Sequence, residues 1–196
     1  MGGPTVFYFD FNSPYAYLAA ERIEDLLPGA EWRPIAFAIL LGQLGRLEDA
    51  LEELTSAPIV AEVAERAIER GLPPFAPPRG WPVETWSLTP LRAALVAEER
   101  GCLREFSLAA YRKSFVESRS LADLDNVLAA AREVGLDPGE VGEAIERPEI
   151  KQRLKDNTEE ARACGVTGIP TVAVGEQLFW GDDRLEHAAA AVGRGE

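Results

Sequence analysis

A single serine, Ser13, follows a short aromatic segment and directly precedes a proline. Residues 5–9 are β-branched and aromatic, a composition that favours a strand, and from Pro14 onward the apolar residues adopt helical spacing. Ser13 is therefore a natural N-cap, because its hydroxyl can accept a hydrogen bond from a first-turn N–H. The same hydroxyl, at the positive end of a helix, could instead hold an anion or a thiolate.

A second segment that could do chemistry lies near the other end of the chain. Pro170 opens a predicted strand, so it must occupy a place where no ladder N–H is needed. A cis bond before Pro170 would aim the carbonyl of Ile169 into free space, where it could bind an extended peptide. Asp182 and Asp183 then begin the last predicted helix, where acids complement the helix dipole.

Together these segments resemble the 2-hydroxychromene-2-carboxylate isomerase family, which is grouped with the kappa-class glutathione transferases in the DsbA-like branch of thioredoxin folds. The family's aromatic strand, Asp and Ser-Pro-Tyr appear at residues 7–17, and its Gly-hydrophobic-Pro-Thr, Phe-Trp-Gly and Asp-Arg patterns at residues 168–184. A weaker match, residues 81–85, stands where the family has an aromatic-Pro-x-Asn-Thr stretch. The resemblance covers essentially the whole chain. It implies an α/β, thioredoxin-like fold with an all-helical insertion.

The resemblance also implies a cis bond between Ile169 and Pro170, a binding site and a reaction. Ser13 would hold the sulfur of glutathione or another low-molecular-weight thiol, and the main chain of Ile169 before Pro170 would bind the cysteinyl part. Asp183 would meet the γ-glutamyl ammonium, with Asp182 as a second candidate. The reaction would be the isomerisation of a small conjugated aromatic substrate by reversible addition of the thiolate to a double bond, without a metal.

Two other classes of function stay open. The chain could be a glutathione transferase-like or non-catalytic binding protein that kept the fold and altered the thiol site. A disulfide oxidoreductase is disfavoured, because residues 13–16 contain no sulfur to exchange.

The chain departs from the family pattern in the helical insertion. Family members supply an asparagine and a lysine there, yet residues 42–58 contain no asparagine, and Arg46 is their only cation. Glu84 replaces the asparagine of the aromatic-Pro-x-Asn-Thr stretch, and a carboxylate there would repel an anionic ligand. The identity of the thiol is therefore open.

Composition narrows the classes of partner. The 196 residues include 33 acids and 20 bases, for a net charge of −13, which disfavours nucleic acid. No long apolar run or basic leader is present, so we expect a cytoplasmic protein that does not bind membranes, with a homodimer left open. Cys102, Cys164 and His187 form no metal-binding pattern. Cys164 falls on the apolar side of its predicted helix, which predicts a buried, inert thiol.

The coarse organisation follows from changes in periodicity. Strands are predicted near residues 5–10, 31–37, 170–174 and 177–180, with helices between the second and third. Residues 1–37 and 150–196 would form the discontinuous thioredoxin-like domain, and residues 38–149 the helical insertion. Predicted helix starts are Ser120, Asp137 and Pro148. Residues 71–82, rich in proline, are either a linker or a rigid loop that lines the cleft opposite Ser13.

Overall fold

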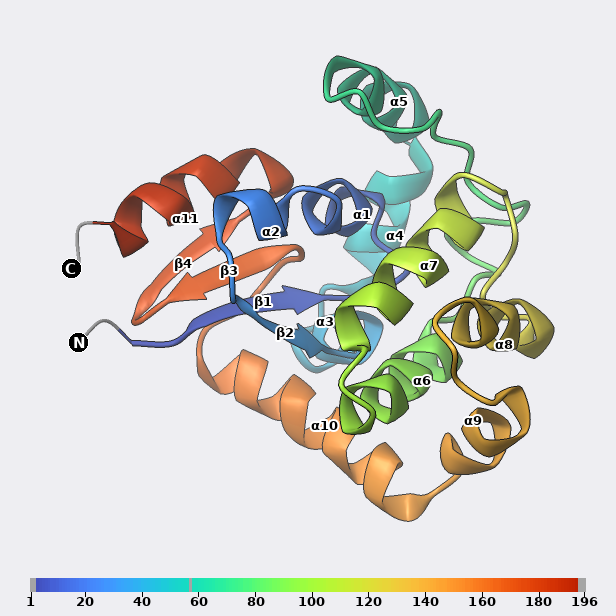
Figure 1. The fold of residues 1–196 in the computed structure, drawn as a ribbon. Helices are drawn as coiled ribbons and strands as arrows, with labels where there is room; N and C mark the ends of the chain where they lie inside the picture. Colours follow the sequence, from blue (N-terminus) through green and yellow to red (C-terminus); the bar gives the residue numbers. More distant parts are fainter. Residues whose placement is uncertain (1–2, 57, 194–196) are drawn as a thin grey trace.

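A four-stranded mixed sheet forms the centre of the computed structural model, which describes residues 3–56 and 58–193 (Figure 1). The strands are β1 (Thr5–Phe9), β2 (Glu31–Pro34), β3 (Thr171–Val174) and β4 (Gln177–Trp180), in the order β2-β1-β3-β4. β1 pairs in parallel with β2 and antiparallel with β3, and β3 pairs antiparallel with β4. The four predicted strands are thus confirmed, in the described chain, with no strand between β2 and β3.

The second strand is shorter than predicted. It ends at Pro34, although apolar residues continue to Phe37. The N–H of Ala36 donates to the Thr158 hydroxyl (3.0 Å), and that of Phe37 donates to the Asp10 carboxylate (2.9 Å). The side chains of Thr158 and Asp10 thus accept from backbone N–H groups that a longer strand would use for sheet pairing. A helix begins at Phe37 instead.

Helices supply the rest of the regular structure. Their bounds are α1 (Pro14–Ala20), α2 (Ile23–Leu26), α3 (Phe37–Gln43), α4 (Leu47–Ser56), α5 (Ile59–Glu69), α6 (Leu88–Glu99), α7 (Leu103–Phe115), α8 (Leu124–Glu133), α9 (Pro138–Ala144), α10 (Pro148–Ala163) and α11 (Leu185–Val192), with a 3-10 turn, η1 (Asp182–Arg184), before α11. Within the described ranges, no helix combines the length and the apolar character needed to cross a bilayer.

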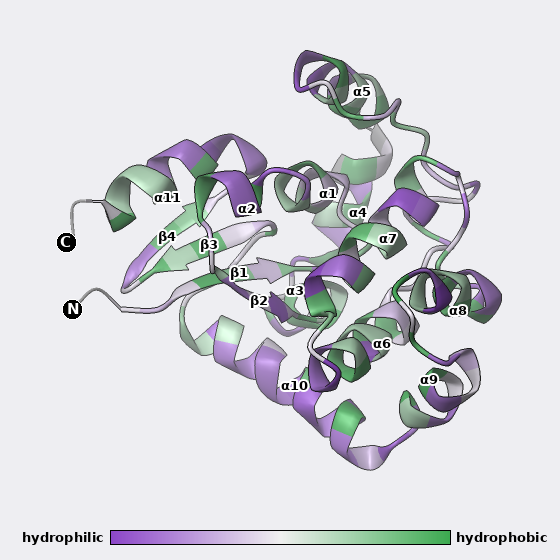
Figure 2. Ribbon diagram, viewed as in Figure 1, coloured by the Kyte–Doolittle hydropathy of each residue, from purple (hydrophilic) through white to green (hydrophobic). Residues whose placement is uncertain are grey.

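The helices cover both faces of the sheet and extend beyond one end of it. α1, α2 and α11 lie on one face and α10 with α3 on the other, while α4 to α9 gather beyond the ends of β1 and β2 (Figure 1). α10 is mostly hydrophilic (Figure 2), yet it turns Ile150, Leu154, Thr158 and Ala161 inward at helical spacing.

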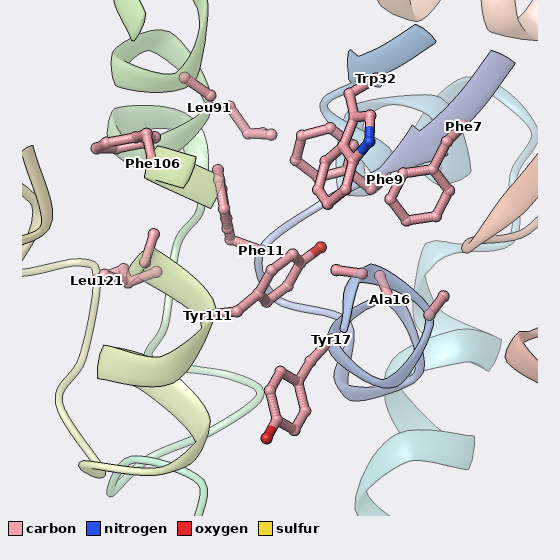
Figure 3. Packing of buried hydrophobic residues seen from close by; sticks show 14 of the residues in the cluster. Phe7, Phe9, Phe11, Ala16, Tyr17, Trp32, Leu91, Phe106, Tyr111 and Leu121 are labelled. Carbon is pink, nitrogen blue, oxygen red and sulfur yellow. The ribbon is translucent and has the colours of Figure 1, made fainter. Parts of the chain in front are cut away.

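An aromatic core joins the sheet to the helical segment. Phe9 and Phe11 pack edge to face with ring centroids 5.5 Å apart, and Phe11 contacts Tyr111 of α7 at 5.0 Å (Figure 3). The Tyr111 hydroxyl donates to the backbone oxygen of Asp10 at 3.1 Å. Such aromatic pairs contribute about 0.5–1.5 kcal/mol beyond the burial of their area. The end of β1, just before Ser13, is therefore held rigidly.

The division into a discontinuous thioredoxin-like domain and a helical insertion, with boundaries at residues 37 and 150, stays a prediction.

Several local predictions can be compared with the structure. Asp137 caps α9 and Pro148 begins α10, as predicted. The prediction that Ser120 caps the next helix was wrong: its hydroxyl accepts from the Ala122 N–H in the turn before α8, and the N-cap of α8 is Asp123. Cys164 was wrongly predicted to be buried. It is exposed, because it is the C-cap of α10 and follows the last helical residue, so it does not continue the buried face of the helix.

The peptide bond between Ile169 and Pro170 is cis, as predicted, and so is the bond between Trp81 and Pro82.

Candidate functional site

A pocket of about 390 Å³ opens at the end of β1 beside the first turn of α1. Its walls come from five parts of the chain, namely residues 10–15, α3 and α4, the start of α5, residues 82–87, and residues 167–169 with Trp180. Apolar side chains from α3 and α4 dominate one wall. Segments from the two ends of the sequence and from its middle thus meet around Ser13.

Ser13 is the N-cap of α1 and also lines the pocket. Its side-chain oxygen accepts a hydrogen bond from the Ala16 N–H at 3.2 Å. In residues 3–56 and 58–193 the Ser13 hydroxyl donates no hydrogen bond, and the N–H of Tyr15 has no partner. Capping and ligand binding are therefore compatible, because the cap uses the lone pair of Ser13 and leaves its proton free to donate.

Asp10, three residues before Ser13, is a functional candidate that the sequence reasoning did not assign. Its carboxylate is buried but lines the pocket, and it accepts hydrogen bonds from the N–H groups of Asn12 and Phe37, both at 2.9 Å. Burial raises the pKa of Asp10 above its ordinary value, while these bonds and one from Ser87 act to lower it. The Ser13 N–H donates to the Asp10 backbone oxygen at 3.1 Å. Asp10 thus fixes the turn that carries Ser13.

Asn12 joins that turn to the proline-rich loop. Its side-chain amide donates to the Pro82 carbonyl at 3.0 Å and accepts a hydrogen bond from the Thr85 hydroxyl at 2.6 Å. The Trp81 indole N–H donates to the Asn12 backbone oxygen, also at 3.0 Å. Of the two interpretations of residues 71–82, the structure favours the rigid loop, because Pro82 lies in the pocket wall.

Ile169, whose backbone was predicted to bind an extended peptide, lines the pocket together with Gly168. Among the described residues, neither the N–H nor the carbonyl of Ile169 has a backbone partner, so both are free for a ligand. Pro170 itself is buried and does not line the pocket. The Gly181 N–H donates to the Pro170 carbonyl at 2.9 Å, which holds η1 beside this segment.

The two predicted acidic ligands differ in their surroundings, and neither lines the pocket. Asp182 is 1% exposed and pairs with two guanidinium groups, those of Arg66 in α5 (2.6 Å) and of Arg70, the C-cap of α5. Asp183 is exposed. The Asp182 carboxylate is thus neutralised from within the chain and ties α5 to η1, which leaves Asp183 as the acid with room for a ligand's ammonium.

The same ion cluster reaches the first turn of α1. Arg66 also pairs with Glu62 at 2.6 Å, and Glu62 accepts a hydrogen bond from the Tyr15 hydroxyl at 3.1 Å. The Arg66 guanidinium lies 5.4 Å from the centroid of the Tyr15 ring. Burial, followed by the charge of Glu62, raises the pKa of Tyr15 to about 12. Tyr15 therefore keeps its proton and donates it to the Glu62 carboxylate within the pocket wall.

The two departures from the family pattern have different positions. Arg46 lines the pocket, and its guanidinium donates to the Thr167 carbonyl at 3.4 Å, next to Gly168. Glu84 is exposed, lies against Gly80 and does not line the pocket. Water therefore screens the Glu84 carboxylate, and its expected repulsion of an anionic ligand in the pocket is weakened. Arg46, in contrast, supplies a cation at the pocket wall.

Comparison with known proteins identifies the family of the chain. The model of the DSBA-like thioredoxin domain matches residues 5–193, almost the whole chain. This chain belongs to the DSBA-like thioredoxin domain family. The predicted thioredoxin-like fold with its helical insertion is therefore confirmed.

Individual relatives of this DSBA-like domain include an isomerase. The 2-hydroxychromene-2-carboxylate isomerase of Sphingobium xenophagum is 29% identical over 187 residues, which cover 92% of this chain and 93% of the relative. A solved structure of 2-hydroxychromene-2-carboxylate isomerase superposes with a TM-score of 0.83 at 20% identity, covering 98% and 95% of the two chains. The resemblance stated from the sequence is confirmed.

Disulfide-exchanging proteins share the fold at a lower level of similarity. The cytosolic disulfide reductase DsbM of Pseudomonas aeruginosa, solved with GSH, gives a TM-score of 0.59 at 17% identity over 98% of both chains. At residues 13–16 this chain has Ser-Pro-Tyr-Ala, so the first turn of α1 carries no cysteine.

Proposed function

We propose that this protein is a thiol-dependent isomerase of small conjugated aromatic compounds. The observation that carries the proposal is the Ser13 hydroxyl, whose proton is free and which faces a pocket with a large apolar wall. A hydroxyl donor and a helix N-terminus both favour the thiolate over the thiol. The similarity to 2-hydroxychromene-2-carboxylate isomerase supports an enzyme of this class.

The residues around Ser13 suit a peptide-like thiol such as glutathione. The free N–H and carbonyl of Ile169 would pair with its backbone, and Asp183 would meet its ammonium group. Arg46 would bind a carboxylate, in a wall whose other charged groups are Asp10 and Glu62. We place this chemistry in the cytoplasm, where low-molecular-weight thiols are kept reduced.

The protein's own part in the reaction is to hold and orient. When bound, the thiolate would add reversibly to a conjugated double bond, so that the resulting single bond can rotate before the thiolate leaves and the other geometric isomer forms. Ser13 would donate a hydrogen bond to the sulfur, Asp10 and Asn12 would fix the turn that carries Ser13, and the apolar wall would exclude water. The thiol is returned and nothing is oxidised.

A transferase-like or binding role is the second candidate, favoured by the absence of the family's asparagine and lysine from residues 42–58. Incubation with 2-hydroxychromene-2-carboxylate and glutathione separates the alternatives. An isomerase returns free thiol and an isomer of unchanged mass, a transferase gives a product heavier by the thiol, and a binding protein gives neither.

Thiol binding should be visible as stabilisation. A thiol at 100 times its Kd that binds only the folded chain adds about 2.7 kcal/mol. For a chain of this size that raises the Tm by roughly 5–10 °C. A thermal-shift series with glutathione, cysteine and 2-mercaptoethanol measures this, with S-methylglutathione as the control that cannot form a thiolate. If none of the thiols raises the Tm and the isomerisation proceeds without them, the proposed function is wrong.

A further inference from the structure

Two exposed tryptophans line the pocket. Trp86 is 66% exposed and Trp180 is 60% exposed. The other two tryptophans of the chain have structural surroundings, since Trp32 packs in the aromatic core and Trp81 donates to the Asn12 carbonyl. Exposure of a large aromatic side chain gives up the stability that its burial would contribute. Two such side chains at a single pocket suggest that a ligand covers them.

Trp180 is oriented by the absence of a side chain at Gly168. A Cβ built on Gly168 would lie 2.2 Å from both Cε2 and Nε1 of the indole and 2.8 Å from Cδ1. Three neighbouring ring atoms at such similar distances place one face of the five-membered ring over the glycine. Because the side chain is still largely exposed, the opposite face is available to the pocket.

Trp86 is positioned through the residue that precedes it. It follows Thr85, which is buried and donates to the Asn12 side chain at 2.6 Å. The residues that carry the two indoles are thus anchored independently, Trp86 next to the hydrogen-bonded pair of Asn12 and Thr85, and Trp180 at the end of β4, against Gly168.

We propose that Trp86 and Trp180 are specificity-determining residues, which select a planar conjugated ligand over a saturated one of the same charge and similar size. The inference rests on the proposed function and deepens it by naming the side chains that recognise the conjugated system. Flat π-systems gain from stacking on an indole face, whereas a puckered saturated ring gains only from burial of its area. The preference, rather than affinity alone, is therefore the property that the indoles would supply.

The test measures this preference without a thiol. Isothermal titration calorimetry gives the Kd of trans-cinnamate and of 3-cyclohexylpropanoate, which share one carboxylate and differ in planarity. The unmodified protein should bind cinnamate more tightly. Trp86→Leu and Trp180→Leu should each lower the ratio of the two affinities about two- to tenfold, the range of one aromatic contact. Trp180→Phe should keep most of the ratio.

Two further variants sharpen the result. Gly168→Ala introduces the Cβ that collides with the indole, so it should lower the ratio as Trp180→Leu does. Ile68→Ala removes an equally exposed apolar side chain of α5 outside the pocket and should change nothing. Because all these positions other than Gly168 are exposed, the variants should fold normally.

The inference is overturned if the ratio is the same in both leucine variants as in the unmodified protein, or if neither acid binds. Those outcomes leave the proposed function standing, since it is judged by thiol binding and by Ser13. Conversely, a Ser13→Ala variant that loses thiol dependence should retain the preference for cinnamate.

Discussion

Replacing Ser13 with alanine is expected to lower the thiol-dependent rate about ten- to hundredfold. The hydroxyl donates a charge-assisted hydrogen bond to the thiolate in the proposed site, and the loss of such a bond costs about 1.5–3 kcal/mol. The same loss should raise the pKa of the bound thiol by roughly one to two units, at 1.36 kcal/mol per unit. The rate and its pH profile, measured with glutathione and 2-hydroxychromene-2-carboxylate, check both effects.

The cap of α1 requires a matched control, because Ser13→Ala also removes the acceptor for the Ala16 N–H. Loss of an N-cap costs about 0.5–2 kcal/mol of stability. Asp137→Ala removes the corresponding cap of α9, which accepts from Glu140 at 2.9 Å and lies outside the pocket wall. It should lower stability to a similar extent and leave the rate unchanged. A folded Ser13→Ala protein with full activity would reduce Ser13 to a helix cap.

The largest effect on stability is expected for Asp182→Asn. This substitution keeps the volume of the buried side chain but leaves Arg66 and Arg70 without their shared carboxylate. Removing one partner of a buried ion pair costs about 3–5 kcal/mol. Both arginines are partly exposed and can recover some hydration, so we expect a value near 3 kcal/mol. Urea unfolding followed by circular dichroism measures it.

The neighbouring residue provides the control and separates the two acids by role. Asp183 is exposed, so Asp183→Asn should change stability by less than about 0.5 kcal/mol. In the proposed site it should instead weaken the binding of glutathione, which carries the ammonium group, more than that of 2-mercaptoethanol, which has none. Equal stability losses in the two variants would contradict the structural role of Asp182.

Local sequence was sufficient for most of the framework. The strand of residues 5–9 and the cap at Ser13 depend on neighbours within four positions, and both were predicted. The error at the end of β2 occurred where distant side chains intervened. β2 ends at Pro34 because the side chains of Thr158 and Asp10 accept hydrogen bonds from the backbone N–H groups that follow it. Neither of these side chains is close to the strand in the sequence.

The site was predictable only in part for the same reason. Ser13 and Ile169 could be proposed from their motifs, and the structure brings both into one pocket. The hydrogen bonds of the Asn12 side chain to Pro82 and Thr85 join residues about 70 positions apart. In the sequence, the only sign of them was the weak match around Trp81. Asp182 and Asp183 are adjacent and chemically identical, so no property of the sequence could separate the paired acid from the exposed one.

The sequence by itself therefore determined the elements, their order, the family and the serine at the head of α1, because propensity, capping and periodicity act over a few residues. Only the tertiary structure decided which charges are already paired, which backbone groups stay free and which tryptophans remain exposed. Those properties depend on contacts between segments as far apart as Arg66 and Asp182, or Asn12 and Thr85. Burial and pairing are set by the packed chain as a whole, and the chemistry of the pocket follows from them.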